Sequence, residues 1–217
     1  MKQPVRALLP LSLCLAATAC HSAPTAALRD AHYPGRLQHP ATLPVEAVWQ
    51  QHVTASWSGP DGQQERGFDA AVQRQGDSLT VVGLSPLGSV GFSITQRPDG
   101  IDVVNHLAEQ MVIPPNFILL DVQRALFPWF AHAGAEGPRT VERDGELVAE
   151  RWHGGRLTER TFVRAAGKPE GVIRVRYEWG QDDWAAPTHA VLDNGWFGYR
   201  LTIATISETR IPPGDHQ

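Results

Sequence analysis

The stretch LTVVGLSPLGSVGFSIT, residues Leu79 to Thr95, reads as two strands folded back on each other around a short turn. In its second half, Val90, Phe92 and Ile94 alternate with small residues and are expected to share one face. That period of two is typical of a half-buried strand. The stretch therefore predicts an antiparallel hairpin in a sheet with one apolar face.

The turn of this hairpin is unusually apolar. It presents Leu84 and Leu87, although turns are usually polar because their backbone needs water or short polar side chains. One interpretation is that both leucines fold back onto the core. The other is that an apolar loop tip contacts a membrane or another apolar surface. The residues alone leave both interpretations open.

The first 19 residues are typical of a bacterial lipoprotein signal peptide. Lys2 and Arg6 form a positive leader, and residues 7–19 are an apolar run that is short for crossing a bilayer. Small residues precede Cys20, whose thiol we expect to carry diacylglycerol. The alternatives are an ordinary secretory signal cleaved after Ala19 and a membrane-spanning anchor.

The cysteine content agrees with export and lipidation. The chain has two cysteines, Cys14 and Cys20, and cleavage before Cys20 would leave no disulfide and no free thiol. Acyl chains on Cys20 would anchor the protein stably, at roughly 0.8 kcal/mol per buried methylene. His21 follows the cysteine where an aspartate would favour the inner membrane. We therefore expect a periplasm-facing protein anchored in the lipid of the outer membrane.

Residues 20–45 are predicted to be a lipidated N-terminus followed by a flexible tether. The stretch is small and polar, and it lacks apolar periodicity. A flexible coil of this length spans about 25–30 Å. Residues 46–209 then form a single domain, and residues 210–217 are a C-terminal tail.

Composition and motifs argue against several classes of function. The net charge is −4 and no basic cluster is present, so nucleic acid is not expected as a partner. The nine histidines form no metal-binding HxxxH or HExxH pattern, and Ser85 lacks the glycine two residues later that a nucleophile elbow requires. Asp121 and Arg124 are interpreted as a structural ion pair at the rim of a buried helix. We predict a monomer without catalytic residues, metal or cofactor.

The domain is predicted to be mainly β, with neighbouring strands antiparallel because short turns connect them. A sheet of about ten strands must curl, split or close. Residues 133–139 are expected to be a loose connection. The expected strands are residues 46–57, 65–75, 79–84, 90–96, 101–107, 147–153, 156–164, 172–179, 190–192 and 197–207.

A helix is predicted over residues 117–127, between the fifth and sixth expected strands. Pro115 and Asn116 are favourable before or at a helix start, and Pro128 ends it. The helix is apolar nearly all round, so it must be covered on most sides. We expect it to lie across an open face of the curved sheet.

These features resemble the family of LolB, the outer-membrane lipoprotein that receives other lipoproteins. The shared order is a lipobox, a tether, four or five strands, a Pro-Asn-led apolar helix and further strands. The sequence is closer still to a group of uncharacterised LolB-like lipoproteins, some of them associated with aryl polyene biosynthesis. The residues that carry this resemblance are Pro86-Leu87-Gly88, Pro114-Pro115, Leu120 to Gln123, Pro128 and Gly198 to Ile203.

The resemblance implies an incomplete, strongly curved antiparallel β-barrel with a helix in its concave side and an apolar cavity for acyl chains. In LolB, a leucine at the tip of the matching hairpin hands lipoproteins to the membrane. The matching residue is Leu87, and Leu84 is placed with it in a membrane-insertion loop. The residues expected to line the cavity are Phe92, Ile94, Val103, Phe117 and Leu120.

Three hypotheses of function follow from the sequence. The leading one is a lipid-binding protein that delivers an acylated, lipoprotein or polyene cargo to the outer membrane. The second is an assembly lipoprotein that binds a protein partner through a sheet edge or a tryptophan-rich surface, with its interior filled by its own side chains. The third is an enzyme that acts on acyl chains, such as a thioesterase, which would need convergent polar groups in one pocket.

Overall fold

One antiparallel sheet of eleven strands dominates the computed structural model, which describes residues 33–85, 87–107, 111, 113–130, 136–165, 171–181 and 184–212. A 3-10 helix, η1 (Pro40–Thr42), and an α-helix, α2 (Pro115–Leu126), complete the described elements. The strands are β1 (Ala47–Gly59), β2 (Gly62–Gln75), β3 (Ser78–Leu84), β4 (Val90–Arg97), β5 (Gly100–Asn105), β6 (Gly137–Arg143), β7 (Glu146–His153), β8 (Arg156–Arg164), β9 (Val172–Glu178), β10 (His189–Asn194) and β11 (Tyr199–Arg210).

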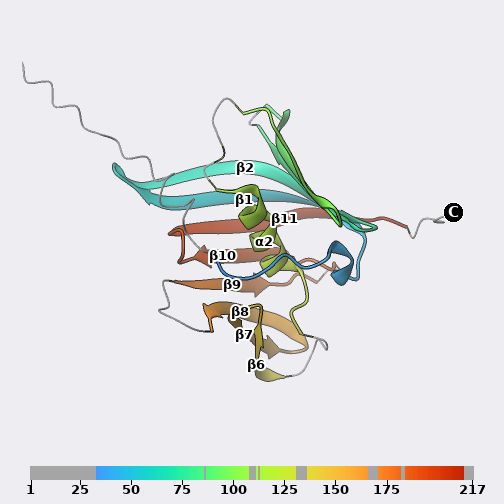
Figure 1. Cartoon of the computed structure of the whole chain (residues 1–217), viewed down its shortest axis with the longest axis vertical. Coiled ribbons are helices and arrows are strands. Elements are labelled where there is room, and N and C mark those ends of the chain that lie inside the picture. The colour runs from blue at the N-terminus through green and yellow to red at the C-terminus, as the bar shows by residue number, and fades with distance from the viewer. Residues whose placement is uncertain are drawn as a thin grey trace, which may run out of the picture.

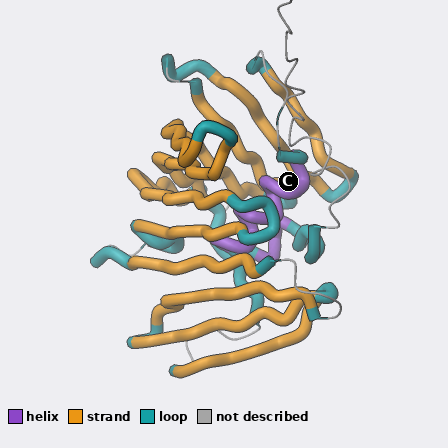
Figure 2. The backbone as a smooth tube through the Cα atoms, turned by 90° about the vertical axis from the view of Figure 1, so that its left-hand side faces the viewer, coloured by secondary structure: helices purple, strands orange, loops and turns teal. Residues whose placement is uncertain are grey.

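The sheet consists of two meanders joined side by side. Its order is β5-β4-β3-β2-β1-β11-β10-β9-β8-β7-β6, so the pairing of β1 with β11 joins the two halves. The outer strands β5 and β6 do not pair with each other, and the sheet stays open. The helix α2 follows β5 and precedes β6 in the chain, and it lies across one face of the curved sheet (Figures 1 and 2). The prediction of an incomplete, curved antiparallel barrel with a helix across its face is confirmed.

One strand, β6, was not predicted from the sequence. The expected loose stretch of residues 133–139 overlaps β6, which pairs with β7 from Gly137↔Trp152 to Arg143↔Glu146. Val141 is the single strongly apolar residue of this strand, so no alternation of apolar and polar residues marks it. It forms because the neighbouring β7 supplies hydrogen-bond partners for its backbone.

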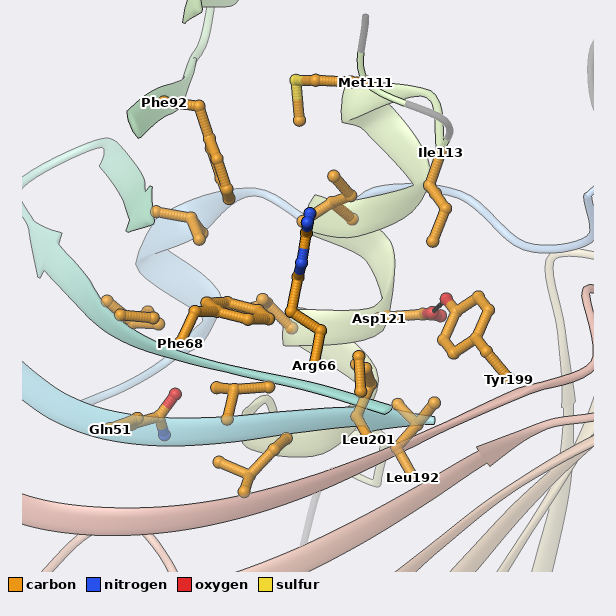
Figure 3. A pocket seen from close by; sticks show the side chains of 18 of the residues that line it. Gln51, Arg66, Phe68, Phe92, Met111, Ile113, Asp121, Leu192, Tyr199 and Leu201 are labelled. Carbon is orange, nitrogen blue, oxygen red and sulfur yellow. Dashed lines mark hydrogen bonds between the residues drawn. The ribbon is translucent and has the colours of Figure 1, made fainter. Parts of the chain in front are cut away.

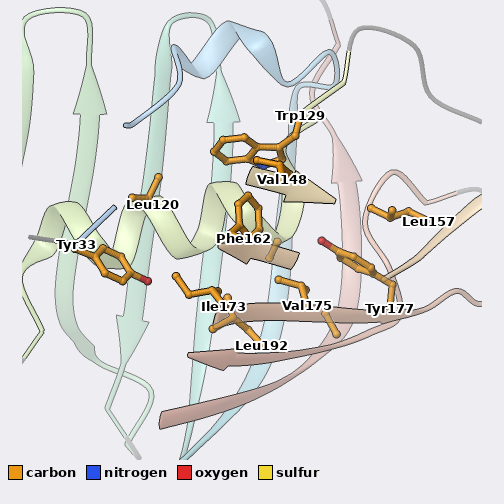
Figure 4. Close-up of a cluster of buried hydrophobic side chains, with 12 residues drawn as sticks. Tyr33, Leu120, Trp129, Val148, Leu157, Phe162, Ile173, Val175, Tyr177 and Leu192 are labelled. Carbon is orange, nitrogen blue, oxygen red and sulfur yellow. The ribbon is translucent and has the colours of Figure 1, made fainter. Parts of the chain in front are cut away.

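Two apolar clusters fill the space between the sheet and α2. One lies under β1–β4 and contains Trp49, Leu79, Ile94, Leu119 and Phe127, all with at most 1 % of their surface exposed. The other lies under β7–β11 and is drawn in Figure 4. Because each half of the sheet needs its own cover, the helix must be apolar on both flanks. The second cluster is made of Tyr33, Leu120, Ala125, Trp129, Val148, Leu157, Phe162, Ile173, Val175, Tyr177, Ala190 and Leu192.

The predicted ion pair between Asp121 and Arg124 forms, with 3.0 Å between Arg124 Nη1 and Asp121 Oδ1. Its predicted place at the rim is wrong, because both side chains are buried. Burial is possible because Glu146 of β7 lies 2.8 Å from Arg124 Nη2 and supplies a second carboxylate. The carbonyl of Arg124, near the end of α2, accepts from Arg160 Nη1 at 2.6 Å, which satisfies one terminal carbonyl of the helix.

Part of the expected tether is packed against the domain. Residues 33–45, the N-terminal strap, cross in front of α2 (Figure 1), and Tyr33, Gln38 and Leu43 are buried. Gln38 N–H donates to Gln123 Oε1 at 2.7 Å, which ties the strap to the helix. The prediction of a flexible tether is therefore wrong for residues 33–45, because buried side chains and hydrogen bonds fix them. Residues 20–32 lie outside the described residues.

Candidate functional site

A cavity with a volume of about 340 Å³ lies between α2 and the half of the sheet around β1, β2 and β11 (Figure 3). Most of its wall is apolar. Strands supply one side, α2 the opposite side, and the connection between β5 and α2 the rim. The lining residues are Gln51, Val53, Ala55, Arg66, Phe68, Ala70, Val72, Val81, Phe92, Leu107, Met111, Ile113, Ile118, Asp121, Val122, Leu192, Tyr199, Leu201 and Ile203.

The cavity exists because some strand residues that face α2 have small side chains, and the side chains of the helix do not fill the space that they leave. Ala55 of β1 and Ala70 of β2 both point into it, and each leaves room that a larger residue would occupy. Their neighbours on the same face, Val53 and Phe68, are directly paired across β1 and β2. Alternation along the strands thus places an apolar wall on one face and solvent on the other.

Phe92 is held in the cavity wall by a glycine on the next strand. Gly83 pairs directly with Phe92, and a Cβ atom built on Gly83 would lie 2.2 Å from Phe92 Cε1. The ring therefore occupies the space over Gly83. Beyond this pair, Leu84 is opposite Val90 and Gly91 is the extra residue of a β-bulge. The predicted alternation through Val90 breaks at this bulge, and Val90 is exposed.

The floor of the cavity is polar but internally satisfied. Asp121 accepts hydrogen bonds from the hydroxyls of Tyr33 and Tyr199, and from Asn194 Nδ2 at 3.0 Å. Burial, reinforced by the negative charge of Asp121, raises the pKa of both Tyr33 and Tyr199 well above the usual value for tyrosine. With Arg124 beside it, this carboxylate already has several donors. The floor therefore offers little unused hydrogen-bonding capacity to a ligand.

The turn between β3 and β4 projects an apolar tip. Leu87 is 95 % exposed, and Leu84 is half-buried. Gly88 N–H donates to Ser85 O at 2.8 Å, and Ser85 N–H donates to Ser89 O at 2.7 Å, so the turn is closed by its own backbone. The described residues of this turn thus separate the two leucines, and the inward-folding interpretation does not apply to Leu87.

The family model described as "Protein of unknown function (DUF3261)" matches residues 48–207. The chain belongs to the DUF3261 family. No curated protein matches the sequence significantly.

Solved structures that are similar to this DUF3261 chain include proteins of the LolA superfamily. A LolA superfamily protein from Nitrosomonas europaea is 13% identical over 82% of this chain and 96% of its own, with a TM-score of 0.42. A putative outer membrane lipoprotein-sorting protein domain from Vibrio parahaemolyticus is 8% identical over 78% and 87%, with a TM-score of 0.40. The lipoprotein LppX from Mycobacterium tuberculosis is 11% identical over 83% and 100%, with a TM-score of 0.34. These scores are too low to support an inference about function.

The sequence family is DUF3261, and the similar structures carry names from the LolA superfamily and from lipoproteins. The closer assignment to LolB and the association with aryl polyenes stay predictions.

Of the five residues expected to line the cavity, the structure places Phe92 in its wall. Val103 is 43 % exposed, because β5 is an edge strand with solvent on both faces. Ile94 is fully buried in the apolar cluster under β1–β4. Phe117 and Leu120 pack into the other cluster, under β7–β11. The expectation of a cavity lining is wrong for these four residues.

The face of α2 explains the error on the helix. Ile118, Asp121 and Val122, spaced by three and four residues, share the face that lines the cavity. Because the helix is apolar nearly all round, its sequence could not show which face meets the open space. Sequence reasoning also missed Arg66 and Phe68 of β2, which lacks a continuous apolar alternation at its start.

The lipidation site, the tip proline of the β3–β4 turn, membrane-spanning helices and metal sites are the remaining features to place. Cys20 and Pro86 lie outside the described residues. Within the described ranges, no helix is long and apolar enough to cross a membrane. Among the same residues, no three His, Cys, Asp or Glu side chains gather closely enough to hold a metal ion.

Proposed function

We propose that this protein is a non-enzymatic, lipid-anchored protein of the outer membrane that binds an acylated or polyene-bearing molecule and helps to deliver it to the membrane. The observation that supports this function is the apolar cavity between α2 and the sheet. Its volume of about 340 Å³ lies within the roughly 300–1,000 Å³ of small-molecule pockets. Each methylene of a guest buried there contributes roughly 0.8 kcal/mol.

Binding is tested by equilibrium titration with a fluorescent fatty acid, using a full chain that carries Cys20→Ala and cannot be acylated. Ala55→Phe puts a ring into the cavity and should weaken binding by at least about tenfold, since even two lost methylene contacts cost that much. The matched control is Thr54→Phe, whose side chain lies on the opposite face of β1. Equal binding by all three proteins, or no binding by any, would reject the cavity as the site.

The nature of the cargo is a separate measurement. Mass spectrometry of the natively purified protein should show a co-purifying molecule with a long acyl or polyene chain. An interior that is occupied by a protein partner or by no molecule in every preparation would instead favour the assembly role.

We assign delivery to the exposed tip of the β3–β4 turn. Leu87 can enter the apolar layer of a membrane because its side chain is 95 % exposed. Leu87→Glu should leave the unfolding midpoint unchanged and abolish most transfer of bound ligand to liposomes. Ile206→Glu is the matched control, since Ile206 is also apolar and exposed at 58 % but lies on β11. Unimpaired transfer by Leu87→Glu would remove this role.

Anchoring through Cys20 is proposed from the sequence of the N-terminus. Mass spectrometry of the N-terminal peptide from membrane fractions should find Cys20 as the first residue and carrying acyl chains. A free N-terminus at Cys20 without lipid would show the ordinary secretory cleavage.

A further inference from the structure

One cation stands among the apolar residues of the cavity. Arg66 of β2 is paired with Ala55 of β1 and lies on the same face of the sheet as Phe68. Its side chain is therefore directed into the cavity. Figure 3 shows its nitrogen atoms extending between Phe92 and Met111. The residue is exposed, which places it where the cavity meets solvent.

The guanidinium of Arg66 has no hydrogen-bond or ion-pair partner among the residues that the structure describes. Other inward-facing arginines are paired: Arg74 lies 2.7 Å from Glu46, and Arg160 lies 2.7 Å from Glu150. Arginine presents a planar fork of donors that fits a carboxylate or phosphate with two parallel hydrogen bonds. Among the described residues, the fork of Arg66 at the mouth of the apolar cavity is therefore free to bind an anion.

The carboxylate of Asp121, which also lines the cavity, does not pair with Arg66. Asp121 lies beside Tyr199, away from Arg66, on the far side of the space (Figure 3). Its oxygens accept from Tyr33, Tyr199, Asn194 and Arg124, so its charge is already compensated locally. Among its described residues, the cavity thus has an internally satisfied floor and, at its mouth, a solvent-exposed cation without a charged partner.

We infer that the ligand of this cavity is an amphiphile with a single long apolar chain and an anionic headgroup, carboxylate or phosphate, and that Arg66 binds that headgroup. The inference rests on the proposed function, because it names the ligand of the same cavity. The chain would lie against Phe68, Ala55 and Val53, with the headgroup at the solvent-exposed end. A volume of about 340 Å³, near the lower end of the usual range, suits one chain better than the several chains of a lipoprotein anchor.

The test compares three ligands with the same saturated chain: dodecanoate, dodecyl phosphate and dodecanol. Isothermal titration of the full chain carrying Cys20→Ala should give at least one anion a dissociation constant about tenfold or more below that of dodecanol, because a charge-assisted pair is added. Arg66→Gln should remove this preference, measured within the variant as the ratio of the dissociation constants of dodecanol and the anions. Arg66→Lys should retain part of it, and added salt should reduce it. The matched control is Arg151→Gln, an exposed arginine of β7 outside the cavity lining, which should bind like the parent.

The outcomes separate the two proposals. If dodecanol binds as tightly as both anions, the role of Arg66 is overturned while the cavity remains a binding site. If the preference persists in Arg66→Gln, another group holds the anion and the inference is likewise overturned. If none of the three ligands binds, the proposed function fails together with the inference. A stronger response to dodecyl phosphate than to dodecanoate supports the inference and identifies a phosphate headgroup; the reverse supports it and identifies a carboxylate.

Discussion

Arg124 is a fully buried cation on which several elements depend. Its guanidinium lies 3.0 Å from Asp121 Oδ1 and 2.8 Å from Glu146 Oε1, and it donates to Pro34 O at 2.7 Å. Its Cζ atom also lies 4.6 Å from the centroid of the Tyr33 ring. Because two carboxylates are removed from water beside it, the loss of this cation leaves both buried without compensation.

Arg124→Met should therefore lower the free energy of unfolding by about 3–5 kcal/mol, measured by urea denaturation. The matched control is Arg176→Met, since Arg176 pairs with Asp193 at 2.8 Å but is half exposed. Its loss should cost at most about 1 kcal/mol, as for other surface ion pairs. Equal and small effects of the two substitutions would show that the buried network contributes little to stability.

The spacing of three residues on an expected helix was sufficient to predict the pairing of Asp121 with Arg124. Their partners Tyr33 and Glu146 come from the N-terminal strap and from β7, far away in the sequence. No local pattern marks such long-range contacts. For the same reason, the burial of the pair could not be predicted.

At the scale of elements, α2 is bound to the strap and to β4 by side-chain amides. Gln123 accepts from Gln38 N–H at 2.7 Å, donates to Gln38 O at 2.9 Å and donates to Gln96 Oε1 at 2.8 Å. Gln96 also donates to Gln38 O at 2.9 Å. Gln123 thus satisfies backbone groups of the strap that would otherwise be buried without partners.

Gln123→Met should destabilise the protein by about 2–4 kcal/mol, since it leaves two or more buried polar groups unsatisfied at about 1–3 kcal/mol each. Hydrogen exchange should show that the amide of Gln38 loses its protection. The control is Gln73→Met on β2, where the side-chain amide donates to the exposed Gln75. Retained protection at Gln38 in Gln123→Met would mean that the strap is held by its apolar contacts instead.

Periodicity and turn residues were sufficient to predict the other ten strands and the helix to within a few residues at most ends. They failed where the physical cause was not local. The strand β6 is defined by its pairing with β7, and the bulge at Gly91 depends on the register of β4 against β3. The four residues wrongly expected to line the cavity have the same explanation. The position of a cavity depends on how the helix packs against the sheet, which no local sequence pattern shows.

At the scale of the whole molecule, the three tyrosines of the chain are shielded from water: Tyr33 and Tyr177 are buried, and Tyr199 is partly buried. Burial raises the pKa of Tyr177 to about 12, a rise that the charge of Arg160 opposes and the charge of Glu150 reinforces. Burial and Asp121 raise the pKa of Tyr33 and Tyr199 well above 10. An unfolded tyrosine ionises near pH 10. The folded state therefore binds these protons more tightly than the unfolded state does.

A higher pKa in the folded state contributes stability that is intact below about pH 10 and is lost as the pH rises toward the folded pKa values. We expect alkaline unfolding to begin in this window, with tyrosinate absorbance rising together with the loss of circular dichroism. The protein in concentrated urea is the control and should titrate near pH 10. Tyrosinate that forms near pH 10 while the fold remains intact would contradict the burial of these side chains.

The joining of β1 to β11 has a consequence for how the chain reaches this fold. Every strand pair of the described sheet except this one connects consecutive strands, so each meander can form through local hairpins. The exception brings Ala47 opposite Arg210 and must close nearly the whole domain into one loop. Non-local pairing of this kind is slow. We expect the two halves of the sheet to form early and independently. The pairing of β1 with β11 should then be the slow step of folding. Because the cavity lies along this pair of strands, it should form only in that slow step.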